Sequence, residues 1–326
     1  MTNDDNTVDE DIAAALTNAF PEREIEEVLP AGPSWNDLNE TVRVEFVNGQ
    51  LVFLKIAADG DGSRITRECA AIDYVGAHCN VVVPTVIASE TTSDPPYLVT
   101  APMRERSLAS QWAELNKTER TTVLRQIGTA LADVNSQEFE RHSHIVSGDA
   151  DGLVLDTGSW TTILVERIGM MREIASSDRF EHYYDEVIKG IKANQERLDL
   201  APATLVHGDP AMPNIFRSET MLGFVDWEIA HIGDPARELH RAQNQLLESR
   251  NLGDDEQLVT ALHDGYRQRA GSLPAGLDDR APIYDAVRFL GTAGFFDKVV
   301  EFSDESPEEV ATWIEAEMTK RLTAIQ

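Results

Sequence analysis

The sequence predicts an α+β protein with two lobes, in which a small antiparallel β-sheet precedes a larger, mainly α-helical region. Residues 41–47 alternate apolar and polar side chains, and Asn48-Gly49 is a typical two-residue turn into a second strand over 51–57. After Pro102 the apolar residues recur three and four positions apart, which is the spacing of one helix face. These two patterns, and the point where one replaces the other, predict the fold class.

The change of pattern also predicts the domain boundary. We expect an N-terminal, β-rich lobe over residues 1–101 and a C-terminal, mainly α-helical lobe over 102–326, with a hinge near 101–104.

The N-terminal elements follow in chain order. A short amphipathic helix is expected over 8–19 and a strand over 25–29, before the hairpin. Apolar periodicity then predicts a helix over about 64–78, and apolar runs predict strands near 81–87 and 97–100.

The C-terminal elements are mainly helices. Thr118 is expected to cap the first of them, and the Gly-, Asp- and Ser-containing segment 141–158 is expected to be irregular. Ser306-Pro307-Glu308-Glu309 has the pattern of a capping box with proline at the first helical position. The remaining expectations are helices over about 160–198, 235–249, 255–270, 280–297 and 306–324, and strands over 204–206 and 222–225.

The charge of the chain narrows the classes of partner. The 326 residues carry a formal net charge of −29, and only six of the 28 cationic residues are lysines. Such a surface does not suit binding to a nucleic-acid backbone, and a lysine-poor acidic chain favours an acidic protein adapted to high salt, that is, a halophilic one. An ordinary acidic protein and a protein with a cationic ligand remain alternatives.

Hydrophobic runs, the N-terminus and the cysteines indicate where the protein is located in the cell. No apolar run is long enough to span a bilayer, and the N-terminus does not resemble a signal peptide, so we expect a cytoplasmic protein without membrane association. Cys69 and Cys79 are too few for a disulfide scaffold or a zinc site, and we expect both thiols to be buried and reduced.

The segment Leu205–Asn214 and the strand after it carry the most informative pattern. His207-Gly208-Asp209 leads to Asn214 five positions after the aspartate, and Asp226 closes the next strand. Phosphoryl transfer needs a carboxylate to accept or orient the acceptor proton, and hard oxygen ligands to hold Mg²⁺ on the phosphates. The same Asp-to-Asn spacing, followed by a metal-binding aspartate, occurs in the catalytic loop of protein kinases.

With Trp227-Glu228 and Gly233-Asp234-Pro235, the chain resembles the aminoglycoside phosphotransferase and choline kinase-like family. The resemblance implies a protein-kinase-like fold and Mg²⁺-dependent transfer of phosphate from ATP, with GTP as a second donor, to a hydroxyl of a small molecule. It implies Asp209 as catalytic base and Asn214 and Asp226 as metal ligands. It also implies that His207 and Asp234 brace the catalytic loop, and His207 is counted among the catalytic residues. Glu228 is implied as a supporting residue. Glu238 stands where the family more often has aspartate, which leaves one supporting contact in doubt.

The N-terminal lobe, 1–101, is expected to hold the nucleotide, and the C-terminal lobe, 102–326, is expected to be the catalytic and acceptor-binding lobe. Lys55 is the sole lysine among the first 116 residues and interrupts an apolar strand, so its ammonium group needs an anionic partner. We expect Lys55 to contact the α- and β-phosphates, held by Glu68 of the following helix, with Glu45 and Asp73 as weaker candidates. The alternative is an edge-strand lysine that discourages aggregation.

Two further contacts to the nucleotide are expected. Ser34 and Asn36, between two strand-like runs, are candidate phosphate donors, although an ordinary polar loop fits as well. The Ala101 carbonyl and the Met103 N–H are spaced to bind an adenine edge, and Pro102 between them lacks only an N–H that adenine does not use.

Two other functions fit parts of the pattern. One is a catalytically silent nucleotide-binding module, and the other is a metal-dependent hydrolase using His207, Asp209 and Asp226, which leaves Lys55 unexplained. The sequence leaves the acceptor open between a cationic amine, a neutral sugar, a hydroxy acid and an amino-alcohol. It does not predict the oligomeric state.

Overall fold

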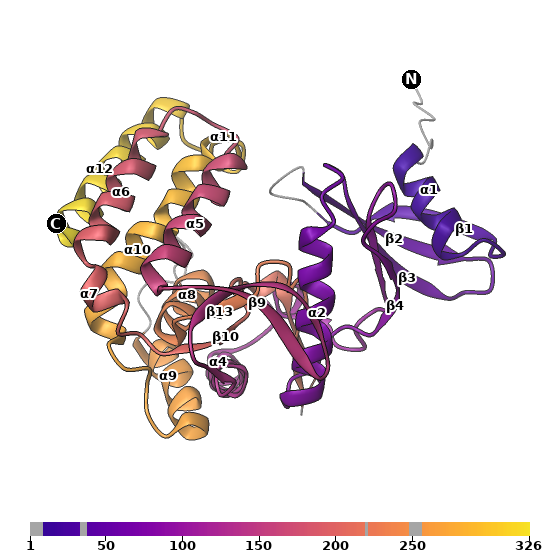
Figure 1. The fold of residues 1–326 in the computed structure, drawn as a ribbon, viewed down its shortest axis with the longest axis horizontal. Helices are drawn as coiled ribbons and strands as arrows, with labels where there is room; N and C mark the ends of the chain where they lie inside the picture. Colours follow the sequence, from indigo (N-terminus) through magenta and orange to yellow (C-terminus); the bar gives the residue numbers. More distant parts are fainter. Residues whose placement is uncertain (1–8, 33–37, 219–220, 248–255) are drawn as a thin grey trace.

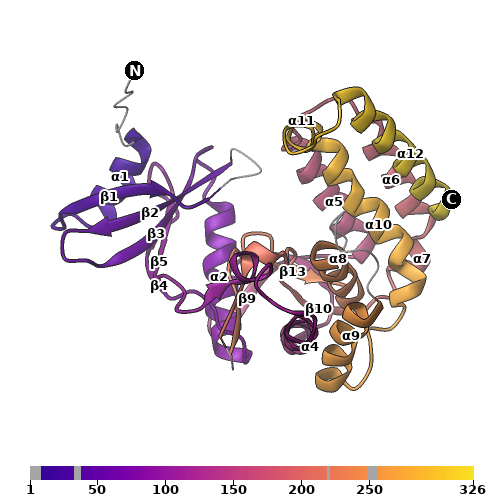
Figure 2. The same cartoon turned by 180° about the vertical axis from the view of Figure 1, so that it is seen from behind.

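The computed structural model describes residues 9–32, 38–218, 221–247 and 256–326. It has the expected two-lobed architecture, with an antiparallel sheet at the N-terminal end and a helical region at the other end (Figure 1). In Figure 2, the reverse view, helix α2 and the β9 hairpin strand again lie between these two ends. No helix within the described residues is both long and apolar enough to cross a membrane.

The N-terminal sheet has the strand order β1-β2-β3-β5-β4, and all neighbouring pairs are antiparallel. The two-residue turn expected at Asn48-Gly49 between β2 and β3 is corrected to three residues, because Phe46 bonds to Gln50 across Val47–Gly49. Gly49 has φ 78°, whereas Asn48 does not adopt the positive φ that a two-residue turn of this type requires. Helix α1 packs on the apolar face of this sheet, where Val44, Val52 and Leu54 are fully buried. The elements are α1 Glu10–Ala19, β1 Ile25–Pro30, β2 Asn39–Phe46, β3 Leu51–Ala57, α2 Ser63–His78, β4 Val86–Glu90 and β5 Tyr97–Thr100.

Helix α2 belongs to the lobe of the sheet by sequence, but its apolar face packs elsewhere. Ile65, Ala71 and Val75 are buried in the hydrophobic cluster of the C-terminal region, and α2 lies along strand β8. The strand expected near 81–87 is corrected at this point. Strand β4 begins only at Val86, whereas Val82 forms a single bridge to Gly223 and exchanges backbone hydrogen bonds with that segment.

A second sheet, of order β7-β10-β13-β8-β9, lies beneath the C-terminal helices. The expectation that residues 141–158 are irregular is wrong, because this segment forms the antiparallel hairpin β8–β9. Its polar residues Ser143 and His144 are buried, so the strand lacks the apolar alternation that would have revealed it. The strands of this second sheet are β7 Glu138–Phe139, β8 His142–Asp149, β9 Gly152–Gly158, β10 Ala203–Val206 and β13 His231–Gly233. A separate sheet of order β12-β11-β6 contains β6 Arg106–Ser107, β11 Ile215–Arg217 and β12 Leu222–Phe224.

The helical region follows the expected periodicity with shifted boundaries. The cap of α4 is Asn116 rather than Thr118, because the Asn116 side chain accepts from the Glu119 N–H in a capping box. The capping box at Ser306 is present. The helices are α3 Leu108–Gln111, α4 Lys117–Val134, α5 Trp160–Glu173, α6 His182–Ala193, α7 Gln195–Leu198, α8 Pro235–Leu247, α9 Glu256–Ala270, α10 Leu277–Gly294, α11 Phe296–Glu301 and α12 Pro307–Ile325, with a 3-10 turn η1 at Met212–Asn214.

Candidate active site

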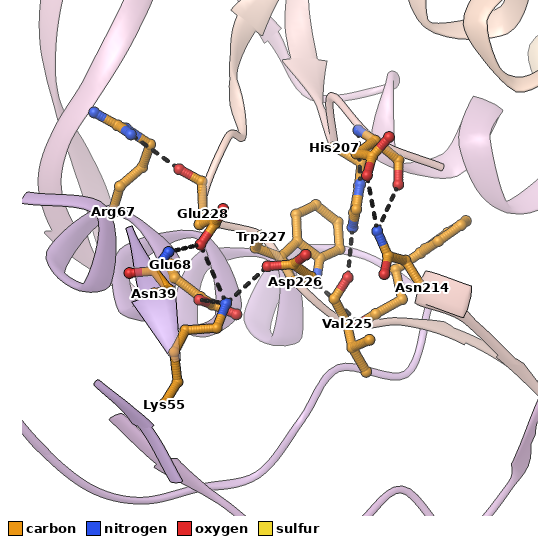
Figure 3. A network of polar contacts seen from close by, with 12 residues as sticks. Asn39, Lys55, Arg67, Glu68, His207, Asn214, Val225, Asp226, Trp227 and Glu228 are labelled. Carbon is orange, nitrogen blue, oxygen red and sulfur yellow. Dashed lines mark hydrogen bonds and ion pairs between the residues drawn. The ribbon is translucent and has the colours of Figure 1, made fainter. Parts of the chain in front are cut away.

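Lys55 of β3 is surrounded by three carboxylates from two parts of the chain. Its Nζ lies 2.7 Å from Oε2 of Glu68 in α2, 2.7 Å from Oδ1 of Asp226 and 3.3 Å from Oε2 of Glu228 (Figure 3). Asn39 of β2 donates to the same Glu228 carboxylate. The lone lysine of the apolar strand therefore meets Glu68, the partner expected from the sequence, and two further carboxylates that follow β12.

The charges around Lys55 do not balance. Burial by itself would lower the pKa of Lys55, but Asp226, Glu68 and Glu228 outweigh it and raise that pKa well above its usual value. Burial, together with the charges of Asp226 and Glu228, raises the pKa of Glu68 to about 7. One ammonium group faces three carboxylates, so it neutralises only part of their negative charge. Their oxygens lie within 4.8 Å of one another, so this donor set fits a divalent cation.

The Asp226 side chain reaches this cluster because of an unusual backbone conformation. Asp226 has φ 66°, in the left-handed region that residues other than glycine seldom adopt. The next residue, Trp227, is fully buried and donates from its indole to the Phe224 carbonyl, which fixes the turn after β12. Trp227 thus anchors the turn between the two carboxylates on either side of it.

Two buried side chains, His207 and Glu238, hold the loop that carries Asp209. The Asp209 N–H donates to Nδ1 of His207, so the hydrogen of the neutral imidazole lies on Nε2, which donates to the Val225 carbonyl at 2.9 Å. Glu238 of α8 accepts the N–H groups of His207 and Gly208. Glu238 makes this loop contact in place of the aspartate that the family more often has.

Gly208 cannot be replaced without moving this loop. It has φ 89°, and a Cβ at this position would lie 2.8 Å from the Ile229 carbonyl oxygen. The glycine of His207-Gly208-Asp209 is therefore required both by the backbone conformation and by the close approach of the neighbouring chain.

The Asp209 carboxylate is bound by groups from three positions. Its Oδ1 accepts from Arg241 at 2.9 Å and from Gln245 at 2.5 Å, both on α8, and its Oδ2 accepts from Asn214 Nδ2 at 3.1 Å. Burial alone would raise the pKa of Asp209, but the charge of Arg241 and the hydrogen bonds from Gln245 and Arg241 outweigh it, and the pKa is lowered. Asp209 is therefore held as an anion.

Asn214 connects the two halves of the site. Its amide nitrogen donates to Asp209, and its backbone carbonyl accepts from the N–H of Val225, the residue before Asp226. Its side-chain oxygen makes no hydrogen bond within the described part of the chain, so it is available as a ligand beside Asp226.

Asp234 makes its contacts to α8 and α10, whereas the sequence predicted that it braces the loop that carries Asp209. Its carboxylate is fully buried, accepts from the Ala236 N–H at the start of α8, and pairs with Arg280 and Tyr284 of α10. Asp234 therefore fixes α8 to α10, whereas Glu238 makes the direct contact to the loop that carries Asp209.

The remaining expected residues are placed as follows. Ser34 and Asn36 lie outside the described residues. Ala101 and Met103 follow β5, and the Ala101 N–H donates to the Thr85 carbonyl. Neither the Ala101 carbonyl nor the Met103 N–H bonds to another described residue, which leaves both groups of the expected adenine contact free of described partners.

Sequence reasoning missed Arg241 and Gln245. The signal that could have found them is their spacing, since Arg237, Arg241 and Gln245 recur every four residues after Gly233-Asp234-Pro235 and share one helix face.

The fold and this pairing of a lysine–carboxylate cluster with an Asp209–Asn214 loop define a phosphotransferase with a protein-kinase-like architecture. The model of the phosphotransferase enzyme family matches residues 33–272, and the chain belongs to this family. No curated protein matches the sequence significantly.

Solved structures with similar folds cover almost the whole chain at low sequence identity. A thermostable mutant of aminoglycoside phosphotransferase APH(4)-Ia has a TM-score of 0.62 at 15% identity, covering 95% of this chain and 97% of its own. A candidate fructosamine-3-kinase from Haemophilus somnus 129PT has a TM-score of 0.64 at 14% identity, covering 97% and 96%. The streptomycin–ATP complex of APH(2")-IIa has a TM-score of 0.58 at 15% identity, covering 96% and 97%. At these identities the similarity shows the fold.

Proposed function

We propose that the protein transfers the γ-phosphate of ATP to a hydroxyl of a small molecule in a Mg²⁺-dependent reaction. The observation that carries this proposal is that Asn214 links a half-buried, ionised Asp209 to the segment that carries two of the three carboxylates around Lys55. ATP in the complex of the structural neighbour APH(2")-IIa supports a nucleotide donor. GTP remains a second donor to be tested.

Each half of the site has its own task in this proposal. Lys55, oriented by Glu68, contacts the nucleotide phosphates, while Asp226 and Asn214 offer oxygen ligands to Mg²⁺, and Glu228 adds charge beside them. Bound there, Mg²⁺ would neutralise charge on the phosphates. The lobe boundary proposed above follows the same division, with residues 1–101 and the hinge at 101–104 holding the nucleotide, and residues 102–326 holding the acceptor.

Asp209 acts on the acceptor. Its carboxylate accepts or orients the proton of the attacking hydroxyl, and His207 and Glu238 keep its loop rigid through the contacts already described. Arg241 and Gln245 hold the carboxylate ionised until an acceptor approaches.

The test is a transfer assay with Mg-ATP labelled at the γ-phosphate, a panel of hydroxylated metabolites and chromatographic detection of labelled product. Transfer to a panel member supports the proposal. Nucleotide binding without transfer would favour a silent module, and turnover of a substrate without nucleotide would favour a metal-dependent hydrolase.

A further inference from the structure

Helix α8 presents a row of polar residues toward the Asp209 carboxylate. Arg241 and Gln245 both donate to Oδ1 of Asp209, so the face of α8 that carries them points at the catalytic group. Arg237 lies four residues before Arg241, on the same face and one turn nearer the start of the helix. The row therefore continues past Asp209 to a second guanidinium group.

Arg237 has no partner that explains its burial. The residue is only 6% exposed, yet its guanidinium group makes no hydrogen bond or ion pair with any residue that the structure describes. A buried charge without a partner is strongly unfavourable, and arginine normally satisfies its five donors with carboxylate, phosphate or carbonyl oxygens. This position is therefore suited to an anion that arrives from outside the chain.

A third arginine lies beside this row. Arg167 of α5 donates from Nη2 to the Ile229 carbonyl at 3.1 Å, while its Nε and that of Arg241 are buried without a partner among the described residues. Burial lowers the pKa of Arg167, and the charges of Arg237, Arg67 and Arg241 lower it further, to well below its usual value. These guanidinium groups are thus close enough to repel one another.

The nearest carboxylates are already occupied. Glu238 accepts two backbone N–H groups of the catalytic loop, and Asp234 is paired with Arg280 and Tyr284. Glu238 and Asp234 keep their negative charges, but within the described residues neither forms an ion pair with Arg237, in a chain whose net charge is −29. Support of Asp209 accounts for Arg241 alone and leaves Arg237 unexplained.

We infer that the phosphate acceptor carries its own anionic group, a carboxylate or a phosphate, which Arg237 binds together with Arg241 and Arg167 while the acceptor hydroxyl meets Asp209. This inference rests on the proposed function and names the substrate class for it. One helical turn of about 5.4 Å separates Arg237 from Arg241. A small hydroxy acid or a sugar phosphate, in which the hydroxyl and the anionic group are a few bonds apart, is the kind of acceptor that this inference names.

Binding of such an acceptor also changes the surroundings of Asp209. An anion that shares Arg241 weakens the ion pair between Arg241 and Asp209, which leaves Oδ1 more available to the acceptor proton. A cationic acceptor would instead place a further positive charge beside Arg237.

The experiment compares acceptors that differ mainly in the anionic group. Glycerate is paired with glycerol, gluconate with sorbitol, and glucose 6-phosphate with glucose, and a cationic amino-alcohol, choline, is included. Phosphate transfer from Mg-ATP and calorimetric binding of each compound are measured for the wild type, Arg237→Gln and Arg237→Lys. The matched control is Arg267→Gln, an exposed arginine of α9 paired with Asp264. Melting temperatures establish that each variant is folded.

We expect the wild type to bind and phosphorylate at least one acid or phosphate ester in clear preference to its neutral partner. Arg237→Gln should raise KM and Kd for that anion about 10- to 100-fold, the range for hydrogen bonds to charged groups, with kcat changed less. Arg237→Lys should restore part of the affinity, and Arg267→Gln should have no effect.

Three results would overturn the inference. If neutral or cationic compounds are phosphorylated as well as the anions, or if Arg237→Gln affects both kinds equally, the inference fails while the proposed function stands. If no anion of the panel binds to the wild type, the inference also fails. If the wild type neither binds Mg-ATP nor transfers phosphate to any compound, the proposed function fails with it.

Discussion

Asp226 is held in a conformation that opposes the stability of the free protein. Its φ of 66° is strained for a residue with a side chain, and its carboxylate lies with two others around one ammonium group. Strain and like-charge repulsion of this kind are typical of groups that bind a ligand, because the ligand relieves them. A substitution of Asp226 should therefore preserve or increase the stability of the protein while it weakens ligand binding.

Asp226→Asn tests this expectation. Asparagine tolerates the left-handed conformation and removes one of three repelling carboxylates, so we expect a melting temperature equal to or above that of the wild type. Mg²⁺-dependent affinity for ATP should fall by at least about 10- to 100-fold, the loss typical of changes around a metal site. Calorimetry and thermal denaturation measure the two effects.

Asp185→Asn is the control, because Asp185 is an exposed carboxylate of α6 paired with Arg172. It should leave ATP affinity unchanged. Undiminished Mg-ATP binding by Asp226→Asn would place the metal elsewhere.

Some contacts of single residues could be predicted from the sequence and others could not. Lys55 was predictable, because a lone ammonium group on an apolar strand requires a carboxylate, and Glu68 opens the next apolar helix face. The contact from Arg241 to Asp209 spans 32 residues and depends on how α8 is oriented under the loop. That orientation is fixed by Asp234 binding to α10, a tertiary contact without a local sequence signal.

At the scale of elements, the contact between α4 and α9 depends on two glycines. A Cβ on Gly265 of α9 would lie 1.9 Å from the Arg125 carbonyl oxygen, and one on Gly128 of α4 would lie 2.0 Å from the Leu262 carbonyl oxygen. The two helix backbones are in direct contact at these positions. Together the glycines allow an approach that no larger residue permits.

Gly265→Ala should destabilise the protein by about 1–3 kcal/mol or more, because the added methyl group meets backbone that cannot move aside. Gly169→Ala on α5 is the matched control, since nothing lies within 4 Å of its Cβ position. The control should be neutral or stabilising by about 0.5–1 kcal/mol through helix propensity. Urea denaturation measures both, and equal effects would contradict the close packing of α4 and α9.

The β8–β9 hairpin shows where prediction of elements fails. Strand β8 begins with His142-Ser143-His144, whose polar side chains are buried, and so lacks the alternation that predicts a strand. Its stability comes from pairing with β13 and packing against α2, which are distant in sequence. The β2–β3 hairpin was predictable, because both its alternation and the turn-forming residues Asn48-Gly49 are local, although the turn has three residues rather than two.

At the scale of the whole molecule, the charge of −29 acts on every part of the surface. Self-repulsion destabilises a compact acidic chain, and the Debye length falls from about 10 Å at 0.1 M salt to about 3 Å at 1 M. Adaptation to high salt remains a prediction. The arginine cluster beside Asp209 shows that this surface charge does not determine the charge of the site.

We expect the melting temperature to rise as KCl is increased from about 0.1 M to about 3 M. A parallel series in sucrose separates charge screening from general exclusion of solutes. A melting temperature that stays constant or falls as KCl increases would contradict adaptation to high salt.

The central claim is that the two halves of the site have separate tasks, with nucleotide bound around Lys55 and chemistry performed at Asp209. The most direct test is turnover of Asp209→Asn with Mg-ATP and an acceptor that the wild type phosphorylates, with ATP affinity measured on the same sample. The amide oxygen can still accept from Arg241 and Gln245, and Asn214 can still donate to the backbone carbonyl of residue 209, so the loop should keep its structure. We predict a loss of about 10²- to 10⁴-fold in kcat, the usual contribution of a general base, with ATP affinity near that of the wild type. Turnover at the wild-type rate would contradict the account.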